Sequence, residues 1–398
     1  MIPAKGQRWT GEAREKLRTA IRDAGFDEVR FAQVEAEPEA SLRHWLEAGF
    51  HADMAWMART ADKRSQVGSV LAGARTVIML GVNYWGGPTA DRERDRSGHP
   101  RWARYALHED YHDTIKPGLV AAGRLLETMG GVTADEYRYY VDTGPVGERG
   151  WAARSGLGFR GKNAMLISRE HGNWLFLACL LTTLEIEPDL PLRPEADRRD
   201  NEEPAGLLCG KCTRCLDACP TQAFPRPGVV DSNRCISYQT IENKGIIPRE
   251  LRAGIGGRIY GCDVCLEVCP WNRFAAEGRK LLLAVRDDLA ELPLPDILAL
   301  TPERFAEVFR RTPIKRLKLT GLLRNACVVA GNSRDRALLP ALVRLVGHDS
   351  ALVRAHAVWA VRSIAGSEAE ELLAEGRMLE RDLLVLAEYE AKADALRS

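Results

Sequence analysis

The sequence predicts a three-part protein: an N-terminal domain that mixes helices with strands, a short cysteine-rich unit and an all-helical C-terminal region. Three observations support this prediction. Helical and strand patterns alternate over the first 200 residues, eight of the ten cysteines fall between Cys209 and Cys269, and helical patterns run on from Thr301. The chain of 398 residues exceeds one ordinary domain, and we place its parts at 1–200, 201–280 and 281–398.

The N-terminal part has the elements of a sheet covered by helices. Its apolar residues recur at helical spacing in four segments: 12–25, 41–58, 111–129 and 145–155. Apolar or β-branched runs predict four strands: 28–34, 75–84, 136–141 and 172–186. The Gly-, Pro- and charge-rich residues 85–102 are expected to form a loop, and the polar residues 187–204 a linker. This alternation fits either an α/β or an α+β domain.

The cysteine-rich unit contains two runs that each end in Cys-Pro. The first run has the spacing C-x2-C-x2-C-x3-C-P from Cys209 to Pro220, which is typical of bacterial ferredoxins that hold [4Fe-4S] clusters. In such proteins the last cysteine of a run ligates the other cluster, so we predict a ferredoxin-like unit with two crossed ligand sets. One set is Cys209, Cys212, Cys215 and Cys269, and the other is Cys219, Cys235, Cys262 and Cys265.

Zinc sites and disulfides are the alternatives for these cysteines. Zinc knuckles usually take two thiolates from each of two short turns, whereas the first run has four thiolates followed by proline. Disulfides are not expected, because the chain opens without an apolar signal-peptide segment and is predicted to be cytoplasmic. Cys179 and Cys327 lie in apolar stretches and are expected to be small buried hydrophobic residues.

Composition excludes a membrane protein and says little about partners. Hydrophobic residues make up 45% and charged residues 28% of the chain, as in ordinary globular proteins. The longest apolar runs, such as 174–181, are too short to span a bilayer. The formal net charge of +1 predicts no nucleic-acid partner by itself, so any such argument depends on local clusters of charge. We expect a monomer that does not bind membranes.

The helical tail contains an internal repeat and a basic stretch. Residues 324–331 align with residues 354–361 at a spacing of thirty, which predicts HEAT-like helical hairpins, with an ordinary helical bundle as the alternative. Six basic residues and no acidic residue fall between Arg310 and Arg324. This stretch is a candidate for contacts with nucleic-acid phosphates, although a solvated run of charge would look the same.

Several motifs together resemble the epoxyqueuosine reductase family. They extend over most of the chain, from about His51 to Trp359. Besides the two cysteine runs, they are YVDTGP at 140–145, GLGFRGKNAMLI at 156–167, CISYQTIENKG at 235–245 and TPIKR at 312–316. A ferredoxin insert alone would supply only the cysteines.

The resemblance implies a cofactor set, a substrate and a reaction. It implies a cobalamin in the N-terminal domain, two [4Fe-4S] clusters that supply electrons, an external low-potential electron donor, and a tRNA bound by the HEAT-like tail. The reaction that it implies is a two-electron deoxygenation of epoxyqueuosine to queuosine in the tRNA anticodon loop, with water as by-product. Removal of an epoxide oxygen needs electrons, which side chains do not supply.

The resemblance also implies site residues. Asp142 matches the proton-donor aspartate of the family, and we expect it to be buried at the mouth of the pocket; a helix cap is the alternative role. Arg59, Ser237 and Asp263 are expected near the cofactor together with Asp142. Tyr238 adjoins Ser237 and shares this expectation. The tRNA contacts are expected from Lys315, Arg316, Lys318 and Arg324.

Two other functions remain open from the sequence. A reductive dehalogenase would share the corrinoid and iron-sulfur chemistry, but the basic tail argues against it. A pure electron-transfer or scaffold protein would need no large domain before the clusters. Asp110-Tyr-His112 is similar to the start of another cobalamin motif, Asp-x-His-x-x-Gly, but Ile115 stands where that motif has glycine. His112 is therefore not predicted to bind cobalt.

Overall fold

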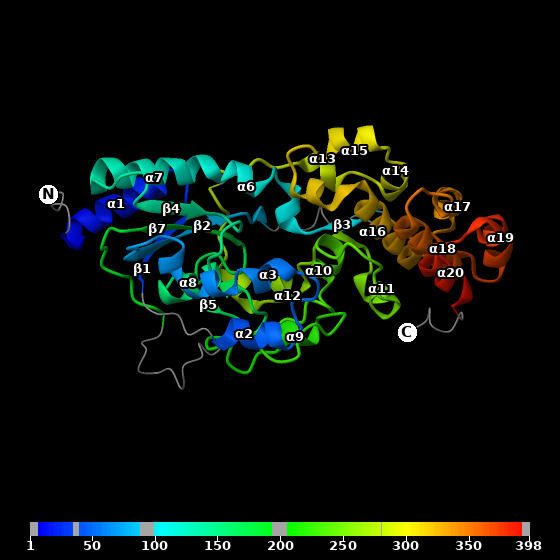
Figure 1. Ribbon diagram of the computed structural model, residues 1–398, viewed down its shortest axis with the longest axis horizontal. Helices are drawn as coiled ribbons and strands as arrows, with labels where there is room; N and C mark the ends of the chain where they lie inside the picture. The colour runs from blue at the N-terminus through cyan, green and yellow to red at the C-terminus, as the bar shows by residue number, and fades with distance from the viewer. Residues whose placement is uncertain (1–6, 35–39, 88–98, 193–204, 280, 392–398) are drawn as a thin grey trace.

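The computed structural model describes residues 7–34, 40–87, 99–192, 205–279 and 281–391. The molecule is elongated, with the N-terminal sheet at one end and the helical tail at the other (Figure 1). The expected boundary near residue 200 lies outside the described residues, as do most of the 85–102 loop and part of the 187–204 linker. Within the described residues, no helix combines the length and the apolar character needed to cross a bilayer.

The N-terminal domain is built on a four-stranded sheet in which every neighbouring pair is antiparallel. The strands, in their order across the sheet, are β1 (Glu28–Gln33), β2 (Thr76–Asn83), β7 (Leu175–Thr182) and β4 (Tyr137–Tyr140). All four strands were expected from the sequence, with ends that differ by a few residues. Their antiparallel pairing makes the domain α+β, so the α/β alternative with a parallel sheet is wrong.

Helices cover both faces of this sheet. Successive side chains of a strand point to opposite faces, so Ile78 packs against one layer and Met79 against the other. Helices α1 (Gly11–Asp23) and α7 (Lys116–Gly130) cover the first face, and α8 (Glu148–Arg154) covers the second (Figure 1). Cys179 is fully buried beneath α8, which confirms the prediction of a buried hydrophobic residue.

Shorter elements connect the sheet to the rest of the chain. The helix expected over 41–58 is broken because Gly49 and Ala52 adopt positive φ angles of 68° and 52°. The remaining elements of this part are α2 (Ala40–Glu47), α3 (Ala55–Arg59), α4 (Ala61–Ser65), η1 (Val67–Ser69), β3 (Arg101–Trp102), η2 (Arg104–Leu107), α6 (Tyr111–Thr114), β5 (Phe159–Arg160) and β6 (Leu166–Ile167).

The cysteine-rich unit packs between the sheet domain and the tail. Two short helices that carry cysteines, α9 (Arg214–Asp217) and α12 (Val264–Glu267), contact each other. Strand β8 (Arg258–Tyr260) pairs in parallel with β3, which ties the unit to the N-terminal part. The other elements of the unit are α10 (Ile236–Ile241), α11 (Arg249–Ile255) and η4 (Pro270–Phe274).

The tail is helical, as expected. The two repeat segments lie on α16 and α18, which approach so closely that a Cβ on Gly331 would lie 2.4 Å from Trp359. Cys327 is fully buried in this core, as predicted. Whether the hairpins are HEAT-like stays a prediction. The elements are α13 (Asp287–Ala290), α14 (Leu294–Leu298), α15 (Pro302–Val308), η5 (Pro313–Leu317), α16 (Lys318–Ser333), η6 (Arg336–Leu338), α17 (Leu339–Val346), α18 (Ala351–Ala365), η7 (Gly366–Glu368), α19 (Ala369–Leu379) and α20 (Leu383–Glu390).

Candidate active site

The eight clustered cysteines are free thiols, and their effects on one another's pKa place them in two groups of four. Burial raises the pKa of Cys215 to about 11, and the nearby thiols of Cys209, Cys269 and Cys212 raise it further. Cys269 therefore lies beside the first run, although it ends the second. We call the group of Cys209, Cys212, Cys215 and Cys269 the first site.

The second group has the same crossed arrangement. Burial raises the pKa of Cys265 well above its usual value, and the thiols of Cys262, Cys235 and Cys219 raise it further. Cys219 thus lies with cysteines that follow it by 16 to 46 positions in the sequence. We call the group of Cys219, Cys235, Cys262 and Cys265 the second site.

One large cavity distinguishes the two sites. It has a volume of about 1980 Å³ and is lined by all four cysteines of the second site. Among the described residues that line it, none is a cysteine of the first site. Pockets for drug-sized ligands usually measure roughly 300–1,000 Å³, so this cavity is large enough for a much bigger group. The second site therefore faces a space fit for a large cofactor, and the first site does not.

Asp142 also lines this cavity, on a loop that holds it in an unusual backbone conformation. Its φ angle is 55°, in the left-handed region that few residues other than glycine adopt. The Tyr111 hydroxyl donates a hydrogen bond of 2.6 Å to Asp142 Oδ2, and His112 Nε2 lies 3.9 Å from the same oxygen. The Asp142 side chain is 60% exposed, so the expectation of a buried carboxyl group is wrong.

Tyr111 is held in place by stacked rings. Its ring stacks on His112 at 4.1 Å and on Phe176 at 4.4 Å between centroids. Burial and the negative charge of Asp142 together raise the pKa of the Tyr111 phenol, so this group stays a hydrogen-bond donor at neutral pH. His112, which was not expected to bind cobalt, belongs to the same network: its Nδ1 lies 2.7 Å from Asp110 Oδ1.

Glu148 is a site residue that the sequence reasoning missed. Its Oε1 accepts a hydrogen bond of 3.0 Å from the backbone N–H of Asp142. Burial, followed by the nearby charge of Asp142, raises the pKa of Glu148 to about 8. An acidic residue at the first position of a helix is ordinarily explained by the helix dipole, so no pattern singled it out. The signal available was its place six residues after Asp142, at the start of the helix that follows the loop.

The other predicted cofactor residues have different outcomes. Ser237 and Asp263 line the cavity, and their contact with a cofactor stays a prediction. Asp263 is 6% exposed, and it accepts a hydrogen bond of 2.8 Å from the backbone N–H of Arg104. Tyr238 is not among the described residues that line the cavity; it donates to the Asp53 carboxylate, which ties α10 to the turn before α3.

Arg59 lies beside the cavity, and its expected place near the cofactor stays a prediction. Helix α3 contributes Trp56 and Met57 to the cavity lining, but the exposed Arg59 at the end of the helix is not among the described lining residues. In this structure Arg59 therefore belongs to the surface beside the cavity.

The four basic residues expected to contact tRNA are split between the surface and the core. Lys315 and Lys318 are exposed, and Arg316 pairs with Glu242 at 2.8 Å while lining the cavity. Arg324 is 0% exposed and donates to the backbone carbonyls of residues 239, 243 and 245. A buried guanidinium satisfied by carbonyls cannot contact phosphates, so the prediction for Arg324 is wrong.

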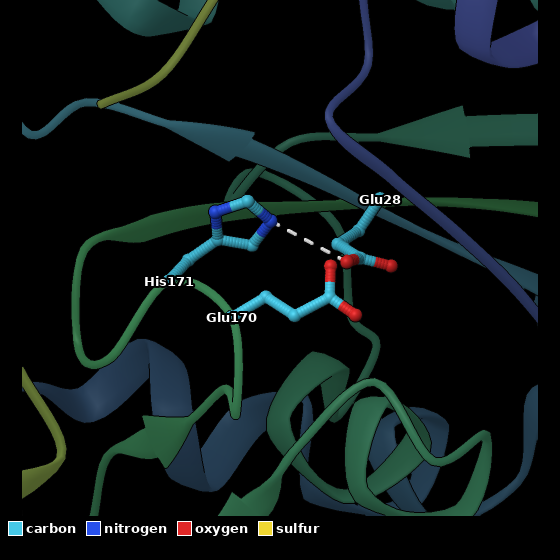
Figure 2. Close-up of side chains that lie close together, drawn as sticks. All are labelled: Glu28, Glu170 and His171. Carbon is cyan, nitrogen blue, oxygen red and sulfur yellow. Dashed lines mark ion pairs between the residues drawn. The ribbon is translucent and has the colours of Figure 1, made fainter. Parts of the chain in front are cut away.

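A second cluster of polar side chains lies away from this cavity. Figure 2 shows Glu28, Glu170 and His171, whose ligand atoms all lie within 4.8 Å of one another. The Asn83 amide lies 3.1 Å from His171 Nδ1 and donates to the carbonyl of Ala276, which fixes the amide so that Nδ1 accepts. The proton of the neutral ring is then on Nε2, 3.4 Å from Glu28 Oε1. A protonated Nε2 pairs with a carboxylate and does not bind a metal ion.

Two families of known sequences match parts of the chain. Residues 64–143 match the family described as epoxyqueuosine reductase QueG, DUF1730. Residues 208–272 match the 4Fe-4S double cluster binding domain, the segment that holds both sites of four thiols. The chain thus contains a double-cluster iron-sulfur domain.

Similar proteins and structures extend the match to nearly the whole chain. The epoxyqueuosine reductase of Xanthomonas campestris is 39% identical over 356 residues, which cover 88% of this chain and 96% of that protein. The epoxyqueuosine reductase of Pseudomonas aeruginosa is 38% identical over 344 residues, 86% of this chain and 91% of that one. A crystal structure of epoxyqueuosine reductase with an epoxyqueuosine-modified tRNA stem loop covers 97% of this chain and 99% of its own, at a TM-score of 0.82 and 27% identity. The chain belongs to the epoxyqueuosine reductase family.

Proposed function

We propose that this protein reduces epoxyqueuosine to queuosine in the anticodon loop of tRNA. The observation that carries the proposal is the single cavity lined by the four thiols of the second site and by Asp142. An electron source and a proton source thus border the same space. In the reaction both C–O bonds of the epoxide break, a C=C bond forms, and the oxygen leaves as water; two electrons and two protons are consumed.

The thiols of both sites fit [4Fe-4S] clusters. Each site has four free cysteines, the ligand number of a cubane cluster, and the chain contains the double-cluster domain. The first site would be held by Cys209, Cys212, Cys215 and Cys269, and the second by Cys219, Cys235, Cys262 and Cys265. Such clusters supply electrons one at a time. A zinc ion in each site would leave the electrons required by the reaction without a source.

The cavity fits a cobalamin. Its volume of about 1980 Å³ is roughly twice the upper end of ordinary ligand pockets. Apolar side chains such as Met54, Trp56 and Met165 line it together with Ser237 and Asp263, a composition suited to a large macrocycle with polar substituents. When bound there, cobalamin would supply a low-potential metal centre for reduction of the epoxide.

The residues of the chain supply the proton. An epoxide oxygen that leaves as an alkoxide is a strong base, so an acid beside it lowers the barrier. Asp142 lies on the cavity wall, and the Tyr111 hydroxyl fixes the orientation of its carboxyl group. Glu148, with a pKa of about 8, holds a proton beside Asp142 at neutral pH. A structure of the Bacillus subtilis enzyme is described with its catalytic aspartate loop swung out of the active site, which is consistent with the exposed loop here.

The basic stretch leads from the surface to the cavity. Lys315 and Lys318 are exposed on η5 and at the start of α16, and Arg316 between them lines the cavity. Cations on the surface would bind the phosphates of the anticodon stem loop, while the nucleoside enters the cavity. An enzyme that acts on tRNA in this way works in the cytoplasm and takes its electrons from an external donor.

Anaerobic turnover of an epoxyqueuosine-containing tRNA stem loop tests the proposal. Protein reconstituted with iron, sulfide and cobalamin should hold about eight irons per chain and, with a strong reductant, should convert the modified nucleoside to queuosine. The nucleosides are separated after digestion and identified by mass. A fully loaded protein that leaves the nucleoside unchanged would contradict the proposal.

A further inference from the structure

The segment 156–167 contributes Met165 to the wall of the cavity, and its tip also touches both cysteine sites. Strands β5 and β6 pair at its two ends and make a hairpin, whose tip is residues 161–165. Within the tip, the Gly161 N–H donates to the carbonyl of Met165, and Ala164 has a positive φ of 62°. The tip is therefore a tight turn, and the side chains that it presents are held by backbone geometry.

Lys162 at this tip binds the backbone of the first site. Its Nζ donates hydrogen bonds of 2.7 Å to the carbonyl of Gly210 and 3.0 Å to that of Cys212. The Lys162 stem packs on Gly206, where an added Cβ would lie 2.4 Å from Lys162 Cγ. Among the residues that the structure describes, no carboxylate lies within ion-pair distance of this ammonium group. The charge of Lys162 is therefore directed at the first cysteine loop.

The next residue, Asn163, contacts the loop of the second site through a neutral amide. Asn163 is 2% exposed, and its amide lies 3.3 Å from the carbonyl of Cys265 and 2.9 Å from Asn173 Oδ1. This contact orders the loop of the second site without bringing a charge. Arg104, a cation near that site, is paired with Glu267 at 3.0 Å and with Asp263 at 3.6 Å. One hairpin tip thus provides a cation to the first site and a neutral donor to the second.

A cation beside an iron-sulfur cluster favours its reduced form. The cluster becomes more negative when it takes up an electron, so a nearby positive charge stabilises the product more than the reactant. Charge and hydrogen bonding around the cysteines are known to set the potentials of such clusters. The partly buried ammonium of Lys162 is less screened by water than a charge on an exposed side chain.

We propose that Lys162 is a positioning residue for the first site, where it orders the Cys209–Cys215 loop and raises the reduction potential of the cluster bound there. The higher potential favours acceptance of an electron from the external donor. This inference rests on the proposed occupancy of both sites by [4Fe-4S] clusters. It assigns a role to Lys162, which is not among the described residues that line the cavity.

The test measures the reduction potential of each cluster in the reconstituted protein. Anaerobic potentiometric titrations, followed by electron paramagnetic resonance, compare the natural protein with Lys162→Gln and Lys162→Arg. In Lys162→Gln, the reduced-to-oxidised ratio of the first cluster at a fixed solution potential should fall about tenfold. This fall corresponds to a reduction potential lower by about 59 mV for a one-electron couple. The second cluster should not change, and Lys162→Arg should keep the natural potential.

Lys211→Gln is the matched control. Lys211 carries the same charge and lies on the Cys209–Cys215 loop itself, but its side chain is exposed, so water screens it and its removal should shift the potential less. Three results would overturn the inference. They are a potential in Lys211→Gln that shifts as much as in Lys162→Gln, an equal shift in the potentials of both clusters in Lys162→Gln, and no shift in the potential of the first cluster in Lys162→Gln. If Lys162→Gln loses the first cluster alone, restoration by Lys162→Arg supports it and failure to restore overturns it. Absence of clusters from the natural protein would instead refute the proposed function.

Discussion

The two cysteine sites come from similar sequences but differ in what surrounds them. The loop that carries the first three cysteines of the first site is exposed at Gly210 and Lys211. All four thiols of the second site instead line the cavity. Burial raises the pKa of Cys215 to about 11 and that of Cys265 well above its usual value. A cluster near the surface suits exchange with a partner, and one on a cavity wall suits delivery to a bound substrate. If both sites hold clusters as proposed, this difference in environment suits the two like motifs to different tasks.

The largest expected effect is a loss of turnover when the proton source at the cavity is removed and the electron source is kept. Asp142→Asn keeps the size of the side chain and can still accept the Tyr111 hydrogen bond, but it cannot give up a proton to the epoxide. Turnover should fall roughly a hundred- to ten-thousandfold, while both clusters and tRNA affinity are kept. Single-turnover reduction by pre-reduced protein is the measurement. A normal rate would show that Asp142 does not supply the proton; it is not a helix cap either, because the N-cap of α8 is Gly147.

Arg324 should matter for stability and not for tRNA. Arg324→Ala removes the donor from the buried carbonyls of residues 239 and 243 and from the partly buried carbonyl of residue 245. Each buried acceptor left unsatisfied costs about 1–3 kcal/mol, so the free energy of unfolding should fall by several kcal/mol. Denaturant unfolding measures it. The exposed Lys315→Ala serves as control and should change stability little; equal effects of the two variants would be inconsistent with the buried network.

The basic stretch should act on tRNA binding and leave both cysteine sites unchanged. Replacing Lys315, Arg316 and Lys318 together by glutamate should weaken tRNA binding. The slope of log affinity against log salt should become shallower by about one for each phosphate that the protein no longer neutralises. Lys16→Glu on α1, at the far end of the molecule, is the control (Figure 1). If the salt series is unaltered in the triple variant, this stretch is not part of the tRNA surface.

The smallest effect concerns the pH dependence of stability. Glu148 has a pKa of about 8 in the folded protein, above its ordinary value of 4.5, so its stabilising contribution is complete below pH 4.5 and is lost as the pH rises through 8. Glu148→Gln removes this loss, and its advantage in melting temperature over the natural protein should grow from pH 5 to pH 9. Melting curves that stay parallel across this range would show that Glu148 is ionised normally.

The sequence predicted the features that depend on local spacing. The cysteine grouping follows from the ferredoxin pattern, and the four sheet strands follow from their apolar runs. Whether neighbouring strands pair in parallel or antiparallel depends on how the chain connects them. The spacing of apolar residues along a strand does not indicate this direction. For Arg324 the basic run continued into a helix whose residues from 321 to 331 are all buried, so charge alone misplaced it. Glu148 was missed because its pKa depends on burial and on Asp142, which only the folded loop brings together.

The crossed grouping of the cysteines is the central claim, and a pair of serine variants tests it directly. Cys219→Ser and Cys269→Ser each remove the last cysteine of a run, and the reconstituted proteins are compared by iron content and by the resonance signal of each cluster. We predict that Cys219→Ser damages the second cluster, with Cys235, Cys262 and Cys265, and that Cys269→Ser damages the first. If each variant instead damages the cluster of its own run, the assignment of the second site to the cavity is contradicted.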